Sequence, residues 1–298
     1  MAIFGKHYDY FLGYALGGGG AKGFAHLGAL KILEKCGLKP DVIAGTSAGA
    51  MVGVFYADGF HPDEIAELFR KRELKEFVEL ALPKSGFLKS TGLHSFLKNN
   101  LRARRFEDLQ IPFHAVATDW NRASTVTFSD GDDLVDAVVA SCSVPILFYP
   151  QYIHGIPYVD GGLLKNLPVT VIRKKCKYVI GVNVSLIMPP VDKYTIRTML
   201  ERTFNLMSNS NTLIDKSYSD ILIETKGIEK YSMFNLNNLE AIMEAGQHYA
   251  AIRMSEKESW QIVRKCHRHY ELTEKIQRNI QRLKQGKVLT NPKEMPEV

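Results

Sequence analysis

The chain has 298 residues, of which 45% are hydrophobic and 23% charged, and it carries a formal net charge of +6. This length is enough to bury one substantial hydrophobic core. No apolar run is long enough to span a membrane, and the charged amino-terminal residues do not suit a signal peptide. The four cysteines are widely spaced without a Cys-x-x-Cys pair, which argues against a disulfide framework and predicts reduced thiols in a cytoplasmic protein.

The first predicted elements are a strand over residues 11–16 and a helix over 24–35, joined by a glycine-rich loop. Residues 17–23 of this loop are Gly-Gly-Gly-Gly-Ala-Lys-Gly. Such a loop exposes several backbone N–H groups together, so it can bind a pyrophosphate, a nucleotide phosphate or a developing oxyanion. The nucleotide alternatives fit poorly. A Walker loop needs a hydroxyl residue where this chain has Gly23, and a dinucleotide site needs an acidic residue at the end of the second strand.

The second strand, predicted over 41–46, leads into Gly45-Thr46-Ser47-Ala48-Gly49 and then into an apolar helix-like run. A serine with a glycine two positions away on either side is typical of a nucleophile elbow, because close backbone packing excludes side chains at both glycines. Two consecutive strand–turn–helix units would place the glycine loop beside Ser47 at the carboxyl ends of parallel strands. The amides of Gly18, Gly19 and Gly20 would then stabilise the oxyanion formed when Ser47 attacks an ester carbonyl.

The middle of the chain continues an α/β pattern. Further strands are predicted over 112–118, 124–129, 156–160 and 178–184, which indicates a largely parallel central sheet flanked by helices. The segment 80–101 either lines or covers a pocket for the acyl group of the ester substrate, or it is an ordinary surface connection. Residues 129–133, Ser-Asp-Gly-Asp-Asp, lack the remaining EF-hand ligands, so we expect a hairpin turn and a helix cap there and no metal.

A base must lie within hydrogen-bonding reach of Ser47 for its hydroxyl to act as a nucleophile. The histidines far beyond the elbow lie in a turn-like segment or in helix-like segments rather than after a strand; they are His154, His248, His267 and His269. Asp160 is the better candidate because it ends the strand over 156–160 and precedes two glycines, although Asp-Gly is also an ordinary turn sequence. A histidine-dependent serine esterase or thioesterase stays open as an alternative, and so does a non-catalytic phosphate-binding regulatory protein.

The sequence changes character after residues 188–190, Met-Pro-Pro. We predict a catalytic core over 1–190 and a mostly helical region over 191–298 that completes the domain, with helices over 194–216 and 238–285. Residues 256–287 contain nine Lys or Arg and four Glu, with apolar residues at helical spacing. This basic helix either lies on anionic lipid at the inner face of a membrane, or it packs on its own domain or on a second subunit of a homo-oligomer, the arrangement we favour. No nucleic-acid-binding motif is present, and no nucleic-acid partner is expected.

Taken in order, these motifs resemble the patatin-like phospholipase family. That family combines a glycine-rich oxyanion loop of the type Gly-Gly-Gly-x-Arg/Lys-Gly, a Gly-x-Ser-x-Gly elbow and an Asp-Gly-Gly/Ala turn. Besides Ser47, Asp160 and the three loop glycines, the matching residues are Lys22, Gly23, Gly45, Gly49, Gly161 and Gly162. Residues 23–30 resemble the family's first helix and residues 140–150 its Ala-Ser-x-x-x-Pro-x-x-Phe-x-Pro segment, so the resemblance runs from about residue 13 to 187.

The resemblance implies a patatin-like three-layer fold and a lipid acyl hydrolase, acting on phospholipid or lysophospholipid without a cofactor. It implies that Ser47 is the nucleophile and Asp160 the base of a dyad that uses no histidine, and that His26 is structural. Asp160 would also activate the water that hydrolyses the acyl-enzyme. A carboxylate is a weak base at its ordinary pKa near 4, and poor solvation in an apolar pocket would raise that pKa towards neutrality.

Overall fold

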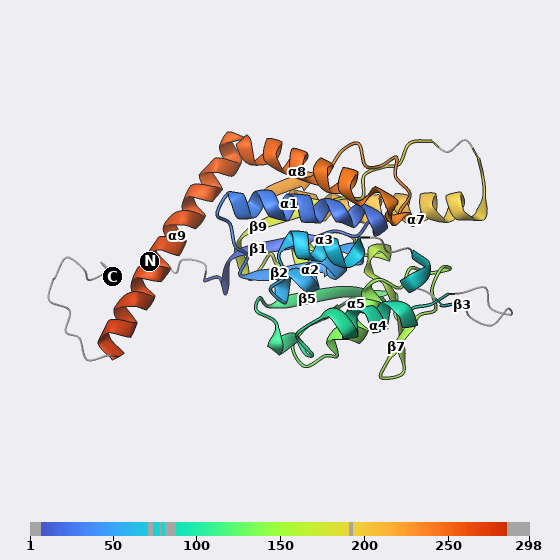
Figure 1. Cartoon of the computed structure of the whole chain (residues 1–298), viewed down its shortest axis with the longest axis horizontal. Helices are drawn as coiled ribbons and strands as arrows, with labels where there is room; N and C mark the ends of the chain where they lie inside the picture. The colour runs from blue at the N-terminus through green and yellow to red at the C-terminus, as the bar shows by residue number, and fades with distance from the viewer. Residues whose placement is uncertain (1–6, 71–73, 78, 81–87, 191–192, 285–298) are drawn as a thin grey trace, which may run out of the picture.

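The computed structural model of the chain describes residues 7–70, 74–77, 79–80, 88–190 and 193–284. A central sheet lies between two layers of helices (Figure 1). The strands of this sheet follow the order β10-β9-β1-β2-β5-β8-β7, and β6 also pairs with β5, whereas β3 (Glu79–Leu80) and β4 (Leu88–Lys89) form a separate two-stranded sheet. The architecture confirms the predicted fold class, a mixed α/β protein with a largely parallel sheet.

Five strands run parallel and form most of this sheet: β10 (Ile221–Glu224), β9 (Cys176–Asn183), β1 (Tyr10–Leu16), β2 (Val42–Thr46) and β5 (Phe113–Asp119). Three more strands are antiparallel to their neighbours: β6 (Ser124–Phe128), β7 (Gln151–Ile153) and β8 (Ile156–Asp160). Asp160, the last residue of β8, pairs with Ala117 of β5, and Thr46, the last residue of β2, pairs with the adjacent Val116, so the ends of the two strands lie close together. The sequence predicted these strands within a few residues, apart from β10 and β7.

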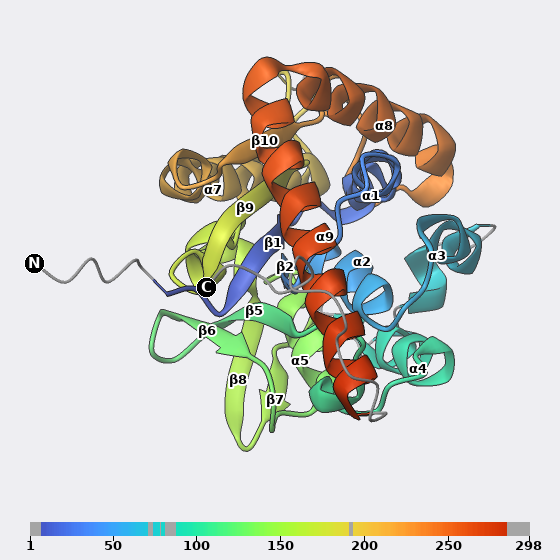
Figure 2. The ribbon, with the colours of Figure 1, turned by 90° about the vertical axis from the view of Figure 1, so that its left-hand side faces the viewer.

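Helices cover both faces of the sheet. One face carries α1 (Phe24–Lys35), α2 (Ala48–Ala57), α3 (Pro62–Phe69), α4 (Thr91–Asn100) and α5 (Leu134–Ser141), and α8 (Leu239–Ser255) packs on α1. The other face carries α6 (Val169–Ile172) and α7 (Ile196–Ser217), as Figure 2 shows end-on. The main core lies under the first face, where every residue of α2 from Gly49 to Ala57 is buried. A helix that is apolar all round must be enclosed in this way, and the α2 sequence has that composition.

The region after residue 190 contributes to the same sheet and core. β10 pairs with β9, and α7 matches the helix predicted over 194–216. The stretch over 238–285 is helical as predicted, and an extended residue at Glu256 divides it into two helices, α8 and α9 (Lys257–Lys284). The break turns α9 away from α8, so that it crosses the edge of the sheet where the parallel strands begin (Figure 2).

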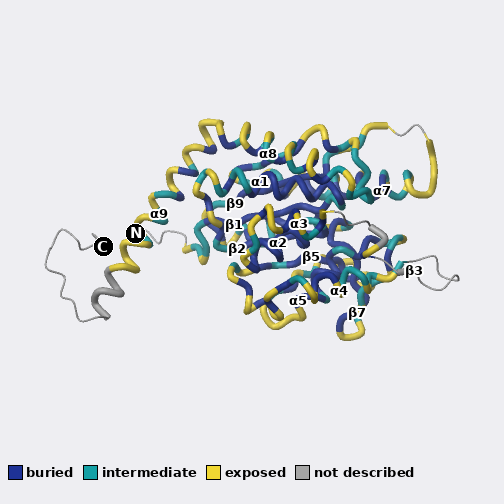
Figure 3. The backbone as a smooth tube through the Cα atoms, viewed as in Figure 1, coloured by how far each residue is buried: buried dark blue, intermediate teal, exposed yellow. Residues whose placement is uncertain are grey.

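The first half of α9 is packed on the domain. Val263 and Cys266 are buried in the main core, and the Tyr270 hydroxyl donates a hydrogen bond to the Lys39 carbonyl oxygen at 2.8 Å. Beyond this point the described side chains are mostly exposed (Figure 3). Among the described residues, no helix combines the length and the apolar character needed to cross a membrane.

Candidate active site

Ser47 occupies the sharp turn between β2 and α2, as the strand–turn–helix pattern predicts. Its backbone has φ 53° and ψ −121°, a conformation that an L-residue adopts only under strain. A Cβ on Gly45 would lie 2.5 Å from the Gly49 carbonyl oxygen, and a Cβ on Gly49 would lie 2.1 Å from the Leu16 carbonyl oxygen. Both positions of the motif therefore require glycine, for the steric reason that the sequence pattern suggested.

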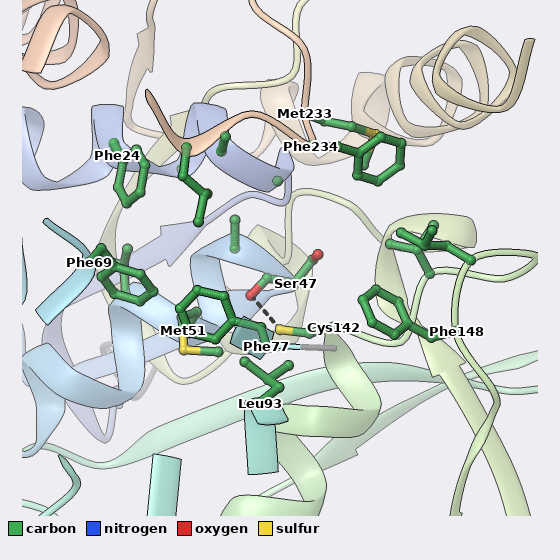
Figure 4. Close-up of a pocket in the computed structure, with 18 residues that line it drawn as sticks. Phe24, Ser47, Met51, Phe69, Phe77, Leu93, Cys142, Phe148, Met233 and Phe234 are labelled. Atoms are coloured by element: carbon green, nitrogen blue, oxygen red, sulfur yellow. Dashed lines mark hydrogen bonds between the residues drawn. The ribbon is translucent and has the colours of Figure 1, made fainter. Parts of the chain in front are cut away.

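The end of α5 holds this strained residue in place. The Ser47 N–H group donates to Ser141 Oγ at 2.9 Å, and that hydroxyl donates in turn to the Val116 carbonyl oxygen at 2.6 Å. The Cys142 thiol donates to the Ser47 carbonyl oxygen at 3.3 Å (Figure 4). The sequence placed both residues in a recognisable segment, 140–150, but gave no sign that this segment supports the turn.

The glycine loop lies beside Ser47 because β1 and β2 are adjacent parallel strands. A Cβ on Gly18 would lie only 3.1 Å from Ser47 Cβ. The Gly18 N–H group is already used, since it donates to the Asn166 carbonyl oxygen at 3.1 Å. No acceptor for the N–H groups of Gly19 and Gly20 is found among the described residues. Of the three predicted donors, these two are the ones left available to a ligand.

The buried side chain of His26 contacts the glycine loop. Its ring is fully buried, and Nε2 lies 2.7 Å from the Gly17 carbonyl oxygen. Burial lowers the pKa of His26 to about 4, so the neutral ring donates its Nε2–H to that oxygen. Lys22 is also buried; burial lowers its pKa, and Glu201 and Glu229 oppose the change. Neither residue lines the pocket described below.

Asp160 lies next to Ser47 at the end of β8 and is fully buried. Its Oδ1 accepts a hydrogen bond from the Gly162 N–H group at 2.7 Å, whereas Oδ2 has no hydrogen-bond partner among the described residues. Burial raises the pKa of Asp160 to about 7; the Ser47 side chain and the Gly162 N–H group oppose this rise by favouring the carboxylate. The fold therefore brings the two predicted residues together and gives the carboxyl group a pKa near neutrality.

Two asparagines connect the loop and the Asp-Gly-Gly turn, and sequence reasoning missed both. The Asn166 side chain is buried, and its Nδ2 lies 3.4 Å from the Gly18 carbonyl oxygen. Asn211 on α7 donates from Nδ2 to the Gly162 carbonyl oxygen at 2.9 Å. The sequence holds no local signal for these contacts, because the partners are far apart in the chain.

A mostly apolar pocket opens over Ser47 and contains about 850 Å³ of empty space, part of it open to solvent. Ser47 lies between two groups of apolar side chains (Figure 4). The lining residues are Gly20, Ala21, Gly23, Phe24, Ser47, Ala48, Met51, Val52, Phe69, Phe77, Leu93, Cys142, Val144, Leu147, Phe148, Met233, Phe234 and Leu236. The last three come from the region after residue 190, in which no motif was recognised. Leu93 comes from the segment 80–101, whose residues 81–87 lie outside the described part of the chain.

None of the pocket-lining residues in the described part of the chain is a histidine. His154 occupies the β7–β8 turn, His248 lies on α8, and His267 on α9 contacts the Cys36 carbonyl oxygen with Nε2 at 2.8 Å. His269, also on α9, stacks on Phe11 with ring centroids 3.8 Å apart. These side chains belong to other parts of the fold than the serine turn.

The acidic loop over 129–133 has the predicted helix cap, but its turn joins β6 to α5, so the expected hairpin turn is wrong. The Asp132 N–H group donates to the Ser129 carbonyl oxygen at 3.1 Å, which closes a turn. The Asp133 side chain accepts from the Asp136 N–H group at 2.8 Å and so caps α5. The described residues contain no cluster of three or more His, Cys, Asp or Glu side chains able to hold a metal ion.

A family model described as patatin-like phospholipase matches residues 14–172, which is more than half of the chain. The chain belongs to the patatin-like phospholipase family. The matched region includes the glycine loop, the Ser47 turn and the Asp160-Gly-Gly turn, so the three motifs of this patatin-like protein all lie inside the family domain.

Relatives of this patatin-like chain are found in animals, fungi and bacteria. It is 34% identical over 182 residues to Patatin-like phospholipase domain-containing protein 7 of Rattus norvegicus, covering 57% of this chain and 13% of that protein. It is 33% identical over 175 residues to an uncharacterized NTE family protein of Mycobacterium tuberculosis, covering 58% of this chain and 46% of that protein. A lysophospholipase of Scheffersomyces stipitis is 31% identical over 180 residues, with 58% of this chain and 12% of that protein covered. The match thus spans less than half of each relative's length.

Two solved structures are similar at a lower sequence identity. VipD from Legionella pneumophila has a TM-score of 0.49 and 14% identity, covering 93% of this chain and 77% of that chain. ExoU from Pseudomonas aeruginosa, solved in complex with SpcU, has a TM-score of 0.35 and 14% identity, covering 84% of this chain and 54% of that chain.

Proposed function

We propose that this patatin-like protein hydrolyses carboxylic esters of lipids, with Ser47 as nucleophile and Asp160 as general base. The observation that carries the proposal is a strained serine beside a fully buried carboxyl group whose pKa is raised to about 7. A general base is most effective when its pKa lies near the working pH. The names of related proteins, among them a lysophospholipase, support phospholipid or lysophospholipid as the substrate class.

The proposed reaction begins when the Asp160 carboxylate takes the Ser47 hydroxyl proton as Oγ attacks the ester carbonyl carbon. The N–H groups of Gly19 and Gly20 stabilise the resulting oxyanion, while Gly18 stays bound to Asn166 and holds the loop in position. Asp160 then returns the proton to the departing alcohol, leaving an acyl group on Ser47. In the second half the carboxylate deprotonates a water molecule, which attacks the acyl-enzyme, and Asp160 returns that proton to Ser47 Oγ as the bond to the fatty acid breaks.

The pocket is suited to bind the acyl chain of the substrate. Its lining is almost entirely apolar, and no Lys or Arg side chain belongs to it among the described residues. An acyl chain is favoured in such a space, whereas a phosphate group would lose its hydration without gaining a partner. We therefore place the acyl chain inside the pocket and the polar head of the lipid outside it.

Labelling with a fluorophosphonate probe and hydrolysis of a soluble ester test the proposal directly. Wild-type protein is expected to be labelled and active, and Ser47→Ala to be neither while keeping its thermal stability. Asp160→Asn should lose activity by a factor of about 10² to 10⁴, the usual contribution of a general base. His248→Gln and His154→Gln serve as matched controls and should keep wild-type activity. Loss of activity in a histidine variant would favour the histidine-dependent alternative, and an unlabelled wild type would favour a non-catalytic protein.

A further inference from the structure

The outward face of α7 carries a regular pattern of uncharged residues that the proposed reaction does not use. Exposed positions recur at alternating intervals of three and four residues: Ile196, Met199, Thr203, Leu206, Ser210, Leu213 and Ser217. Ile196 is 87% exposed and Leu213 is 66% exposed. Figure 2 shows α7 at the margin of the molecule, on the side of the sheet opposite α1. A surface helix normally directs charged side chains to solvent, whereas these seven positions carry four apolar residues, two serines and one threonine.

The spacing points to another helix as the occupant. Alternation of three and four residues gives a mean period of 3.5, the repeat of a coiled-coil seam, and here it persists over three heptads. In that frame Met199, Leu206 and Leu213 occupy the second seam position of each heptad, and the first position holds in turn Ile196, Thr203, Ser210 and Ser217. Ile214 adjoins the seam and is itself 65% exposed, which widens the apolar surface. The opposite side of α7 is fixed to the domain, since Glu201, Ser208 and Asp215 are buried.

We infer that α7 is a self-association surface that packs antiparallel against α7 of a second copy of this chain. Most soluble oligomers are homodimers related by a two-fold axis, which pairs the same surface on both subunits. Antiparallel pairing sets the first position of one seam against the second position of the other. Met199 then meets Ser210 of the second copy and Leu206 meets Thr203, so that a large side chain faces a small one at these two pairs, while Leu213 meets Ile196 at the end of the seam. Parallel pairing would set Ser210 against Ser210 and leave the seam poorly filled.

The size of the surface sets the strength of the contact. A helix of 22 residues is about 33 Å long. One helix pair of that length covers less than the roughly 800 Å² per partner that is usual for a stable complex. Tyr194 and Tyr218, which lie just outside the two ends of the helix, are also exposed. We therefore expect a reversible dimer with a dissociation constant in the micromolar range.

Sedimentation velocity from low to high micromolar protein tests this inference. Wild type should shift from monomer to dimer, and the double variant Leu206→Glu/Leu213→Glu should remain monomeric with wild-type thermal stability. Each substitution is expected to raise the dissociation constant at least about tenfold, because a charge replaces a buried leucine. Leu272→Glu is the matched control, since Leu272 is 51% exposed on α9, and it should leave the dimer unchanged.

Disulfide trapping tests the orientation. Mixing Met199→Cys protein with Ser210→Cys protein should give a cross-linked pair on a non-reducing gel, whereas either variant alone should not. Cross-linking of Ser210→Cys with itself would overturn the antiparallel arrangement. A wild type that stays monomeric at every concentration, or a dimer insensitive to the leucine substitutions, would overturn the self-association surface. These outcomes do not depend on ester hydrolysis, so they test the self-association surface independently of the proposed function.

Discussion

Asp160→Asn should remove activity and yet stabilise the protein above neutral pH. In the folded chain the pKa of this carboxyl group rises from 3.8 to about 7, so the folded state binds its proton more tightly than the unfolded state does. Stability therefore falls as the pH rises from about 4 through 7, because the buried group must ionise at a cost. A difference of roughly three pKa units corresponds to about 4 kcal/mol of lost stability once both states are ionised.

The neutral amide of Asn avoids this cost. We expect the variant to unfold at a higher temperature than wild type at about pH 8. The gain in the free energy of unfolding should be smaller than about 4 kcal/mol, because the hydrogen bond from the Gly162 N–H group to Oδ1 is weakened. At about pH 4, where the wild-type carboxyl group is protonated in the folded state, the difference should largely disappear. Calorimetric melting of both proteins at the two pH values measures this directly.

In the proposed mechanism the same pKa also controls the rate. The base must be ionised to accept the Ser47 proton, so kcat/KM for a soluble ester should rise with pH and level off above about 7. At about pH 6 only about one tenth of the molecules carry the carboxylate, and the rate should be lower by the same factor. A flat profile between about pH 5 and 8, together with an Asp160→Asn variant less stable than wild type at pH 8, would refute the assignment of Asp160 as a buried base.

Three further outcomes follow from the site and the fold. Gly19→Val should lower kcat by about 10² to 10³ with little change in KM, because it distorts an oxyanion donor; an unchanged kcat with a raised KM would indicate a binding loop instead. Phe69→Ala should shift the preferred acyl chain of a p-nitrophenyl ester series to longer chains, since Phe69 lines the pocket and packs on Phe24; an unchanged chain-length optimum would place the acyl chain elsewhere. Val263→Asp should destabilise the protein by about 3 kcal/mol or more in denaturant unfolding, because Val263 is 2% exposed in the core; a wild-type midpoint would show that α9 does not pack there in solution.

The sequence alone determined the local parts of this protein. The serine turn is readable from five consecutive residues because the backbone approaches itself so closely at Gly45 and Gly49 that only glycine fits. The limits of α1 and most strands were predictable for a similar reason, since apolar periodicity and glycine positions depend on neighbouring residues. Asp160 was identified as a strand-end residue from the same kind of local pattern.

The tertiary structure decided how these local parts act together. The pairing of β8 with β5 sets Asp160 near Ser47, and the enclosure of that carboxyl group raises its pKa. No local pattern indicated that the Gly18 N–H group would donate a hydrogen bond to the Asn166 carbonyl oxygen. Nor did any local pattern indicate that the segment containing Met233 would line the pocket. Such contacts join segments remote in sequence. They are set by the order in which strands pair and by the burial of whole faces, which depend on the complete chain rather than on any short stretch of it.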